Sequence, residues 1–443
     1  MRAIRSIWTD YTRANQLASL IRFSVSLLIS MILVRVYFTI DEVGRFEYLI
    51  LLSSTFSFFV GFAYTSAALS KIPKSEQSEW PRQLRQLLWQ LMISAALISL
   101  FALVVIKLSV RFNWIAIEGN QEWYIVGYCF LLIVGIIPEV YYLLYRKAKS
   151  LLIWAVVYYA IQLLIVLILV FLRQPIEYIF LGYMAWQLLR FVWTLHLLKP
   201  NWYIDWLEQR KWFFFSLPLM GHFILGSGMD YLDGHLVSQF FSDSEFLFYR
   251  YGAKELPISI VLVNALSAAL IPLLSQDTSQ VTVLRERTIR LINLLFPVSI
   301  ALLFLSPVLF SIFYGPKFIV SAVIFNIYIL VLSSRILLPQ VLLYAHNDNK
   351  ALLRFSGIEL FVNFVLSIVL MRFLGFYGIA AATVFAFLLN KILTILYIKK
   401  QYALHVGQYL PIKSYLIWVF LLLATCLLSI WMIQLDFYGS ING

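Results

Sequence analysis

Charged residues are scarce in this sequence. They make up 13% of the 443 residues, whereas 62% are hydrophobic. A soluble protein of this length with that balance would leave far too much apolar surface in water, which excludes the soluble class. The mean hydropathy of +0.86 is typical of an integral membrane protein that crosses the bilayer many times.

Cysteine and histidine are also rare. The two cysteines, Cys129 and Cys426, both lie inside apolar runs, which favours neither a disulfide framework nor a thiolate metal site. The five histidines are scattered, with no pair four residues apart, so the sequence indicates no zinc or two-metal site. We therefore expect no metal and no other cofactor.

Thirteen apolar runs are long enough to cross about 30 Å of hydrocarbon, which predicts an all-α polytopic membrane protein. The first run follows a basic stretch that lacks a small-residue cleavage site, so we interpret it as a retained span and not as a signal peptide. The predicted spans cover residues 16–38, 46–70, 84–109, 124–145, 151–172, 176–197, 212–237, 246–274, 288–310, 318–345, 352–371, 375–398 and 412–433.

The basic residues predict an orientation. With the N-terminus in the cytoplasm, the inside segments hold 21 of the 34 Lys and Arg residues and the outside segments hold six. The positive-inside rule requires such an excess. Membrane orientation therefore explains the net charge of +12, and no nucleic-acid partner is needed.

The other seven basic residues lie within predicted spans, at Arg22, Arg35, Arg190, Arg250, Lys254, Arg335 and Lys391. A charge near the centre of a membrane helix costs at least about 2.5 kcal/mol, so such residues usually face a partner or a water-filled cavity. The start of span 246–274 is the most unusual place, because it carries Arg250, Lys254 and Glu255 within six residues.

The sequence repeats itself weakly at an offset of 201 residues. IIPEVYYLLYRKAKSLL (136–152) aligns with LLPQVLLYAHNDNKALL (337–353), which pairs Pro138 with Pro339. At the same offset Arg190 aligns with Lys391. The offset maps the first six spans onto the next six, so both copies have the same orientation and are related by an axis along the membrane normal.

This repeat predicts two six-helix lobes around a central cavity, with an extra C-terminal span. We expect an N-lobe at 1–198, a cytoplasmic linker at 199–211 and a C-lobe at 212–400. Residues 401–443 then hold a second cytoplasmic linker and the additional span.

Three segments, 256–276, 306–318 and 341–387, resemble the bacterial polysaccharide (O-antigen-type) flippases of the multidrug/oligosaccharidyl-lipid/polysaccharide (MOP) superfamily. The most characteristic piece is an Asn-containing span followed by FLGFYGIAAAT. The resemblance implies two six-helix lobes whose cavity opens alternately to each side of the membrane. It also implies transport of an oligosaccharide linked through pyrophosphate to a polyprenyl carrier, across the bacterial inner membrane.

That interpretation defines the expected partners. They are the lipid-linked oligosaccharide and membrane lipid, with a polysaccharide polymerase and glycosyltransferases as candidate protein partners, and the expected functional state is a monomer. A pyrophosphate group needs cations at membrane depth. The candidate substrate-binding residues are therefore Arg22, Arg250, Lys254, Arg335, Arg190 and Lys391.

Four acids within the spans are candidates for coupling or charge pairing: Asp230, Asp233, Glu139 and Glu359. In a tight helical hairpin, residues equally far from the loop lie at the same depth, which places Asp230 level with Lys254 and Asp233 level with Arg250. The same argument pairs Glu359 with Lys391 and Glu139 with Arg190, whereas Arg22 and Arg335 have no acid at matching depth. Each pair either stabilises its lobe or exchanges partners with the substrate, and the sequence leaves both interpretations open.

Three other functions compete with this one. A lipid II flippase of the same superfamily would be expected to have fourteen spans. A cation-coupled multidrug exporter should have an acidic cavity, whereas this chain has more intramembrane bases than acids. A membrane polysaccharide polymerase or glycosyltransferase needs a long catalytic external loop, and the longest one here, 110–123, is short. We therefore expect a transporter and not an enzyme.

Overall fold

The computed structural model describes residues 11–112, 117, 121–199, 203–276, 280–346 and 348–435. Within these ranges every regular element is a helix and none is a strand. Twelve helical segments of the described chain are long and apolar enough to cross a membrane. The prediction of an all-α, multi-pass membrane protein is confirmed.

One predicted span is not among these twelve. Helix α8 (Ile176–Leu198) covers the predicted span 176–197, and its 23 residues extend about 34 Å, which is enough to cross a bilayer. It carries Gln187 and Arg190, both buried inside the protein, and these lower its apolar character. The predicted helix is therefore present, and its polar face is turned into the protein.

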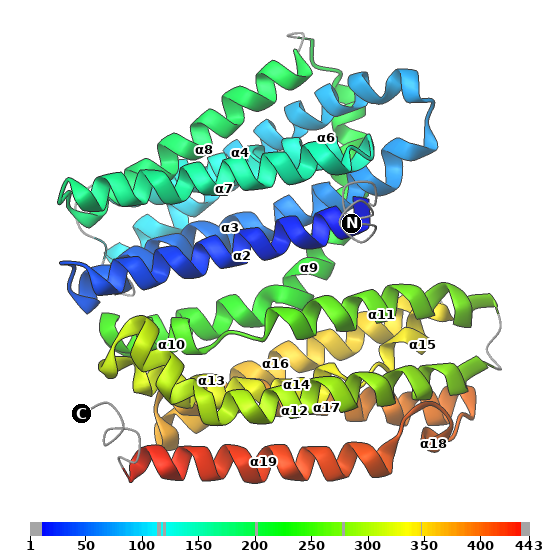
Figure 1. Ribbon diagram of the computed structural model, residues 1–443. Coiled ribbons are helices and arrows are strands. Elements are labelled where there is room, and N and C mark those ends of the chain that lie inside the picture. Colours follow the sequence, from blue (N-terminus) through cyan, green and yellow to red (C-terminus); the bar gives the residue numbers. More distant parts are fainter. Residues whose placement is uncertain are drawn as a thin grey trace. The chain divides into compact units, whose positions relative to one another are not determined.

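The chain forms two compact units, Met1–Ser227 and Gly228–Gly443, and the boundary between them lies inside helix α9 (Trp206–Phe240). In the first unit α2 packs against α7, and Figure 1 shows the two running side by side. Its helices are α2 (Tyr11–Arg35), α3 (Ile40–Lys71), α4 (Trp80–Arg111), α5 (Gln121–Val134), α6 (Ile137–Leu144), α7 (Ala148–Phe171) and α8.

The second unit continues from α9. Its helices are α10 (Asp243–Gly252), α11 (Pro257–Gln276), α12 (Val281–Tyr314), α13 (Ile319–Ile329), α14 (Val331–Arg335), α15 (Gln340–Ala345), α16 (Asn349–Leu374), α17 (Phe376–Tyr402), α18 (Val406–Tyr409) and α19 (Ile412–Gln434). The last of these is the extra C-terminal span, and it packs against α12.

The helix boundaries follow the repeat found in the sequence. Helices α4 and α12 begin 201 residues apart, and so do α7 and α16. Both copies also interrupt the same span, between α5 and α6 in the first unit and between α14 and α15 in the second. Pro138 and Pro339 lie at these interruptions, because proline is tolerated at the start of a helix but not in its interior.

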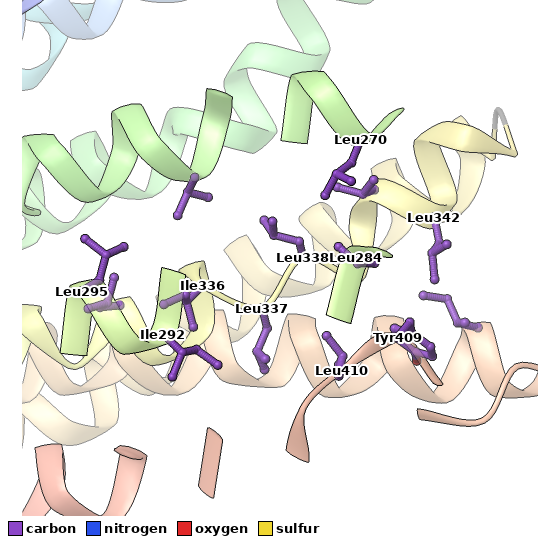
Figure 2. Packing of buried hydrophobic residues seen from close by; sticks show 14 of the residues in the cluster. Leu270, Leu284, Ile292, Leu295, Ile336, Leu337, Leu338, Leu342, Tyr409 and Leu410 are labelled. Atoms are coloured by element: carbon purple, nitrogen blue, oxygen red, sulfur yellow. The ribbon is translucent and has the colours of Figure 1, made fainter. Parts of the chain in front are cut away.

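Non-helical backbone inside a membrane protein must be covered by protein. The segment between α14 and α15 meets this requirement, since Ile336, Leu337 and Leu338 are buried in the hydrophobic core of the second unit. Figure 2 shows them beside Leu284 and Ile292 of α12.

The two copies differ at one span. Helix α3 is continuous, whereas its counterpart is divided into α10 and α11 by residues 253–256. The prediction of one continuous span over 246–274 is therefore wrong. Gly252 and Pro257 flank the break, and the residue before a proline is disfavoured in the helical region.

Both of these spans begin in the same way. Thr39 and Glu42 form a capping box at the start of α3, and Ser242 and Glu245 form one at the start of α10. The copies therefore share their beginning and diverge at Gly252. A Cβ atom at Gly252 would lie 2.5 Å from the Ser321 carbonyl oxygen, so glycine allows α10 to approach α13 closely there.

Candidate functional site

A cluster of charged side chains lies in the second unit where five segments meet. Its members are Asp230 of α9, Glu255 of the α10–α11 break, Arg335 of α14, Glu359 of α16 and Lys391 of α17. Arg335 interacts electrostatically with all three acids, and Lys391 interacts with Glu359, Glu255 and Arg335. We call these five side chains the charge cluster. Four of them were predicted as site residues, and Glu255 was not.

Arg335 is held by a carboxylate, contrary to the expectation that it has no acidic partner. Its Nη2 atom lies 2.7 Å from Glu255 Oε1 and its Nε atom 3.1 Å from Glu255 Oε2, a two-pronged contact. The guanidinium also covers the ring of Phe387 at 4.5 Å. The hairpin argument missed this pair because Glu255 belongs to the helix break and not to a regular hairpin.

The side chain of Arg335 remains 39% exposed, compared with 14% for Glu255. A paired but accessible guanidinium can exchange its carboxylate for another anion. The bidentate fork suits phosphate oxygens as well as it suits a carboxylate.

Asp230 of α9 was predicted to lie level with Lys254. It is exposed and lies within electrostatic range of Glu255, Arg335 and Arg250, so it joins the charge cluster. The Lys254 ammonium lies over the ring of Tyr251, 5.0 Å from its centroid. The depth argument assumes a continuous helix, and the break after Gly252 removes that condition.

Lys391 and Glu359 are linked through two amides and not by direct contact. Lys391 Nζ donates to Gln340 Oε1 at 2.7 Å, Gln340 Nε2 donates to Asn390 Oδ1 at 3.1 Å, and the Asn390 amide donates to Glu359. The charges predicted to be level do lie close together. The amides separate them, so that each retains capacity for another partner.

Asp233 lies deeper, at 1% exposure, and three hydroxyl groups donate to it. Its Oδ2 atom accepts hydrogen bonds from Thr383 Oγ1, from Tyr328 at 3.1 Å and from Tyr249 at 3.4 Å. Its Oδ1 atom is buried without a partner among the described residues. An unsatisfied buried carboxylate oxygen is costly, and it would be satisfied by a proton or a small cation.

The described chain holds no group of three His, Cys, Asp or Glu residues that could bind a metal ion. The oxygen atoms around Asp233 belong instead to neutral hydroxyl and amide side chains. Asn363 donates to Thr383 Oγ1 at 3.2 Å, and its Oδ1 atom accepts from Ser367 at 2.9 Å. One carboxylate with neutral oxygens is a donor set suited to a hard cation.

In the first unit the predicted pair of Glu139 and Arg190 is formed. Arg190 Nη2 lies 2.6 Å from Glu139 Oε2, and the guanidinium also lies 5.0 Å from the centroid of the Tyr158 ring. The repeat places Lys391 at the position of Arg190 and Gln340 at that of Glu139. Both copies therefore use the same two positions for the same contact, once as an ion pair and once as an ammonium–amide hydrogen bond.

Arg22 of α2 is exposed. It is close enough to Tyr159 of α7 for a charge interaction. In the part of the chain that the structure describes, Arg22 forms no hydrogen bond or ion pair. A role for Arg22 in binding an anion stays a prediction.

The sequence analysis missed the polar neutral residues of both clusters. These residues are spread over four helices: Tyr249, Tyr328 and Thr383 around Asp233, and Gln340 and Asn390 beside Lys391. Periodicity does not distinguish them from ordinary helix residues. The repeat was the usable signal, because the offset that aligns Arg190 with Lys391 also aligns Glu139 with Gln340.

Comparison with known proteins identifies the family. The family model described as "Polysaccharide biosynthesis protein" matches residues 83–324, more than half of the chain. The chain belongs to this polysaccharide biosynthesis protein family. A second family model, "Lipid II flippase MurJ", matches residues 219–438. No curated protein is significantly similar to the chain in sequence.

Solved structures show the fold of this family member. Lipid II flippase MurJ in an inward closed conformation matches with a TM-score of 0.66 at 14% identity, over 96% of this chain and 100% of that chain. An inward-facing multidrug resistance MATE family transporter of the MOP superfamily matches at 0.61 and 12% identity, over 87% and 94%.

A MOP superfamily transporter from Pyrococcus furiosus matches at 0.57 and 12% identity, over 91% of this chain and 98% of that chain. The chain therefore has the fold of the MOP transporters, as the resemblance implied. Likeness at these identities describes the fold and leaves the transported molecule open.

Proposed function

We propose that this protein is a flippase that moves a polyprenyl-pyrophosphate-linked oligosaccharide across the bacterial inner membrane by alternating access. Its N-terminus is cytoplasmic in this proposal, and the protein transports its substrate without catalysing a reaction. The polysaccharide biosynthesis family and the basic residues within the predicted spans support this substrate class. The oligosaccharide is a repeat unit of O-antigen, capsule or exopolysaccharide.

One observation carries the proposal: Arg335 is paired with Glu255 at a helix break that the first repeat lacks. In this mechanism the substrate pyrophosphate replaces Glu255 on the Arg335 fork. Lys391, Arg250 and Lys254 add positive charge in the second unit, and Arg22 and Arg190 do so in the first. Release restores the Arg335–Glu255 pair, in which the two charges compensate each other.

Asp233 is proposed as the coupling group, because its unpartnered Oδ1 atom needs a proton or a cation. Asp230 and Glu359 face the same charge cluster and would respond to the arriving pyrophosphate. Glu139 would act in the first unit through Arg190.

A lipid II flippase is the second candidate, since the MurJ family model matches nearly all of the second unit. Both substrates carry a polyprenyl pyrophosphate, so the charge cluster suits either one. A multidrug exporter is the third candidate, and the excess of bases over acids makes it the less suitable. A polysaccharide polymerase is a distant alternative.

Complementation separates these functions. In a strain that lacks its own repeat-unit flippase, the wild-type chain should restore surface polysaccharide, and Arg335→Ala should not, at equal protein abundance. Arg372→Ala, at the far end of α16, is the matched control and should export normally. Rescue of a strain depleted of its lipid II flippase, without rescue of surface polysaccharide, would assign the protein to the second candidate.

A further inference from the structure

Three positions that the repeat relates carry a base and an acid in both copies, but in a different arrangement. The 201-residue offset matches Glu139 with Gln340, Tyr158 with Glu359 and Arg190 with Lys391. The base lies on α8 in the first copy and on its counterpart α17 in the second. The acid lies on α6 in the first copy, whereas in the second it lies on α16, the counterpart of α7, and an amide takes the α6 position.

In the first copy the base and the acid are in direct contact. Arg190 Nη2 lies 2.6 Å from Glu139 Oε2, and the Arg190 side chain is 9% exposed. The guanidinium also lies against the ring of Tyr158, at the position that Glu359 occupies in the second copy. An anion must therefore displace Glu139 before it can bind Arg190.

In the second copy two amides stand between the base and the acid. Lys391 Nζ donates to Gln340 Oε1 at 2.7 Å. Gln340 Nε2 then donates to Asn390 Oδ1 at 3.1 Å, and the Asn390 amide donates to Glu359. Asn390 is buried, and its Oδ1 atom also accepts from Thr394 Oγ1 at 3.3 Å, which fixes the direction of the amide. Each donor points from the base towards the acid, so the chain of hydrogen bonds is internally consistent.

This arrangement leaves the ammonium group of Lys391 with unused donors. An ammonium has three N–H groups, and Gln340 is its one hydrogen-bond acceptor within the described ranges. The Lys391 side chain is partly exposed, and Arg335 lies within electrostatic range of it. Because its nearest partner is a neutral amide, Lys391 keeps its positive charge available for an anion.

Arg335 and Lys391 together suit a pyrophosphate better than a single phosphate. A pyrophosphate consists of two linked phosphoryl groups, each with its own charge and acceptor oxygens. The guanidinium fork of Arg335 suits one group, and the ammonium of Lys391 provides a point charge for the other. A monophosphate has only one group to offer to the two cations, so it gains less from the second one.

We propose that Gln340 is a positioning residue that holds Lys391 away from its acid, so that Lys391 forms the second half of a pyrophosphate site beside Arg335. This inference rests on the proposed function, since it requires a diphosphate substrate. It adds the residue that decides whether the second cation is available. A carboxylate at this position would reproduce the direct contact of the first copy and occupy Lys391.

Native mass spectrometry of the purified full-length protein tests the inference, with undecaprenyl pyrophosphate and undecaprenyl phosphate as separate probes. We expect the wild-type protein to bind the pyrophosphate about tenfold more tightly than the phosphate, the contribution of one charge-assisted contact. In Gln340→Glu this ratio should fall to about one, because the new carboxylate pairs with Lys391. Lys391→Gln removes the cation itself and should lower the ratio in the same way, which keeps the test valid if the first variant does not fold.

Two variants separate the position of the carboxylate from its charge. Gln340→Glu/Glu359→Gln moves the acid next to Lys391 without changing the net charge, and it should lose the preference as Gln340→Glu does. Gln401→Glu adds the same charge at the exposed end of α17 and should keep the preference.

The outcomes distinguish this inference from the proposed function. A pyrophosphate preference that survives in Gln340→Glu or in the double variant would overturn the role of Gln340 and leave the proposed function intact. Equal binding of the two lipids to the wild-type protein would also overturn the inference, because the second cation then selects nothing. A wild-type protein that binds neither lipid would contradict the proposed function and the inference together.

Discussion

The ion pair between Arg190 and Glu139 allows a test of whether a buried charge in this protein is structural or functional. Arg190 is 9% exposed and Glu139 is 31% exposed, with 2.6 Å between the charged atoms. Removing one partner of a buried pair leaves an uncompensated charge and costs about 3–5 kcal/mol. Because Glu139 retains some exposure, we expect Glu139→Ala to destabilise the first unit by about 3 kcal/mol, the lower end of that range.

The double variant Glu139→Leu/Arg190→Leu should behave differently. Replacing both charges with apolar residues is often neutral for stability, since the cost of desolvating the ions also disappears. The assay is thermal unfolding of the detergent-solubilised protein, in which a loss of about 3 kcal/mol lowers the melting temperature by about 6–12 °C. Surface polysaccharide is measured in the same strains.

The two readouts separate the alternatives. A stable double variant that exports normally would make the pair structural, and a stable double variant without export would make it part of transport. If Glu139→Ala melts at the wild-type temperature, the energetic reasoning is refuted, because Arg190 then finds another partner or is solvated at no cost.

Three further predictions concern the second unit. Gly252→Ala should destabilise the protein by about 1–3 kcal/mol in thermal unfolding, since its Cβ atom would lie 2.5 Å from a backbone oxygen. Gly357→Ala is the control and should leave the stability unchanged, because a Cβ atom there has no neighbour within 4 Å. Asp233→Asn keeps the shape of the buried carboxylate, and it should leave the protein folded while abolishing the dependence of transport on an ion gradient; unchanged gradient dependence would contradict the coupling role. Outside the spans, a hydrogen bond from Tyr397 holds the pKa of Asp348 below its usual value. The Asp348 carboxylate therefore stabilises the protein above the unfolded-state pKa and loses this effect as the pH falls through the lowered pKa. The stability difference between wild type and Asp348→Asn should shrink over that acidic range, and a constant difference would refute the assignment.

The sequence alone predicts the architecture because helix length, hydropathy and the repeat are local or periodic signals. The 201-residue offset found in the sequence also separates the starts of α4 and α12, and it relates the interruptions near Pro138 and Pro339. The sequence predicts one continuous span over 246–274, which misses the break between α10 and α11. A break and a kink have the same local signature, and only the packing of α10 on α13 at Gly252 distinguishes them.

The sequence predicts which charged residues belong to the site, but it does not predict which of them contact one another. Depth matching between helices identifies acids and bases at the same level, as for Glu139 with Arg190. It does not identify which helix faces which, so it missed Glu255 as the partner of Arg335. Hydroxyl and amide groups carry no charge signature, and therefore the hydrogen-bond partners of Asp233 and the amides between Lys391 and Glu359 could not be predicted.

The most direct measurement of the central claim is translocation in proteoliposomes that contain only this protein and a polyprenyl-pyrophosphate-linked oligosaccharide. Exposure of the sugar to an impermeant lectin or glycosidase reports movement between leaflets. We expect the wild-type protein to move the substrate, Arg335→Ala to lose this activity and Arg372→Ala to retain it. A wild-type protein that moves no substrate, or an Arg335→Ala variant that moves it at the wild-type rate, would contradict the account.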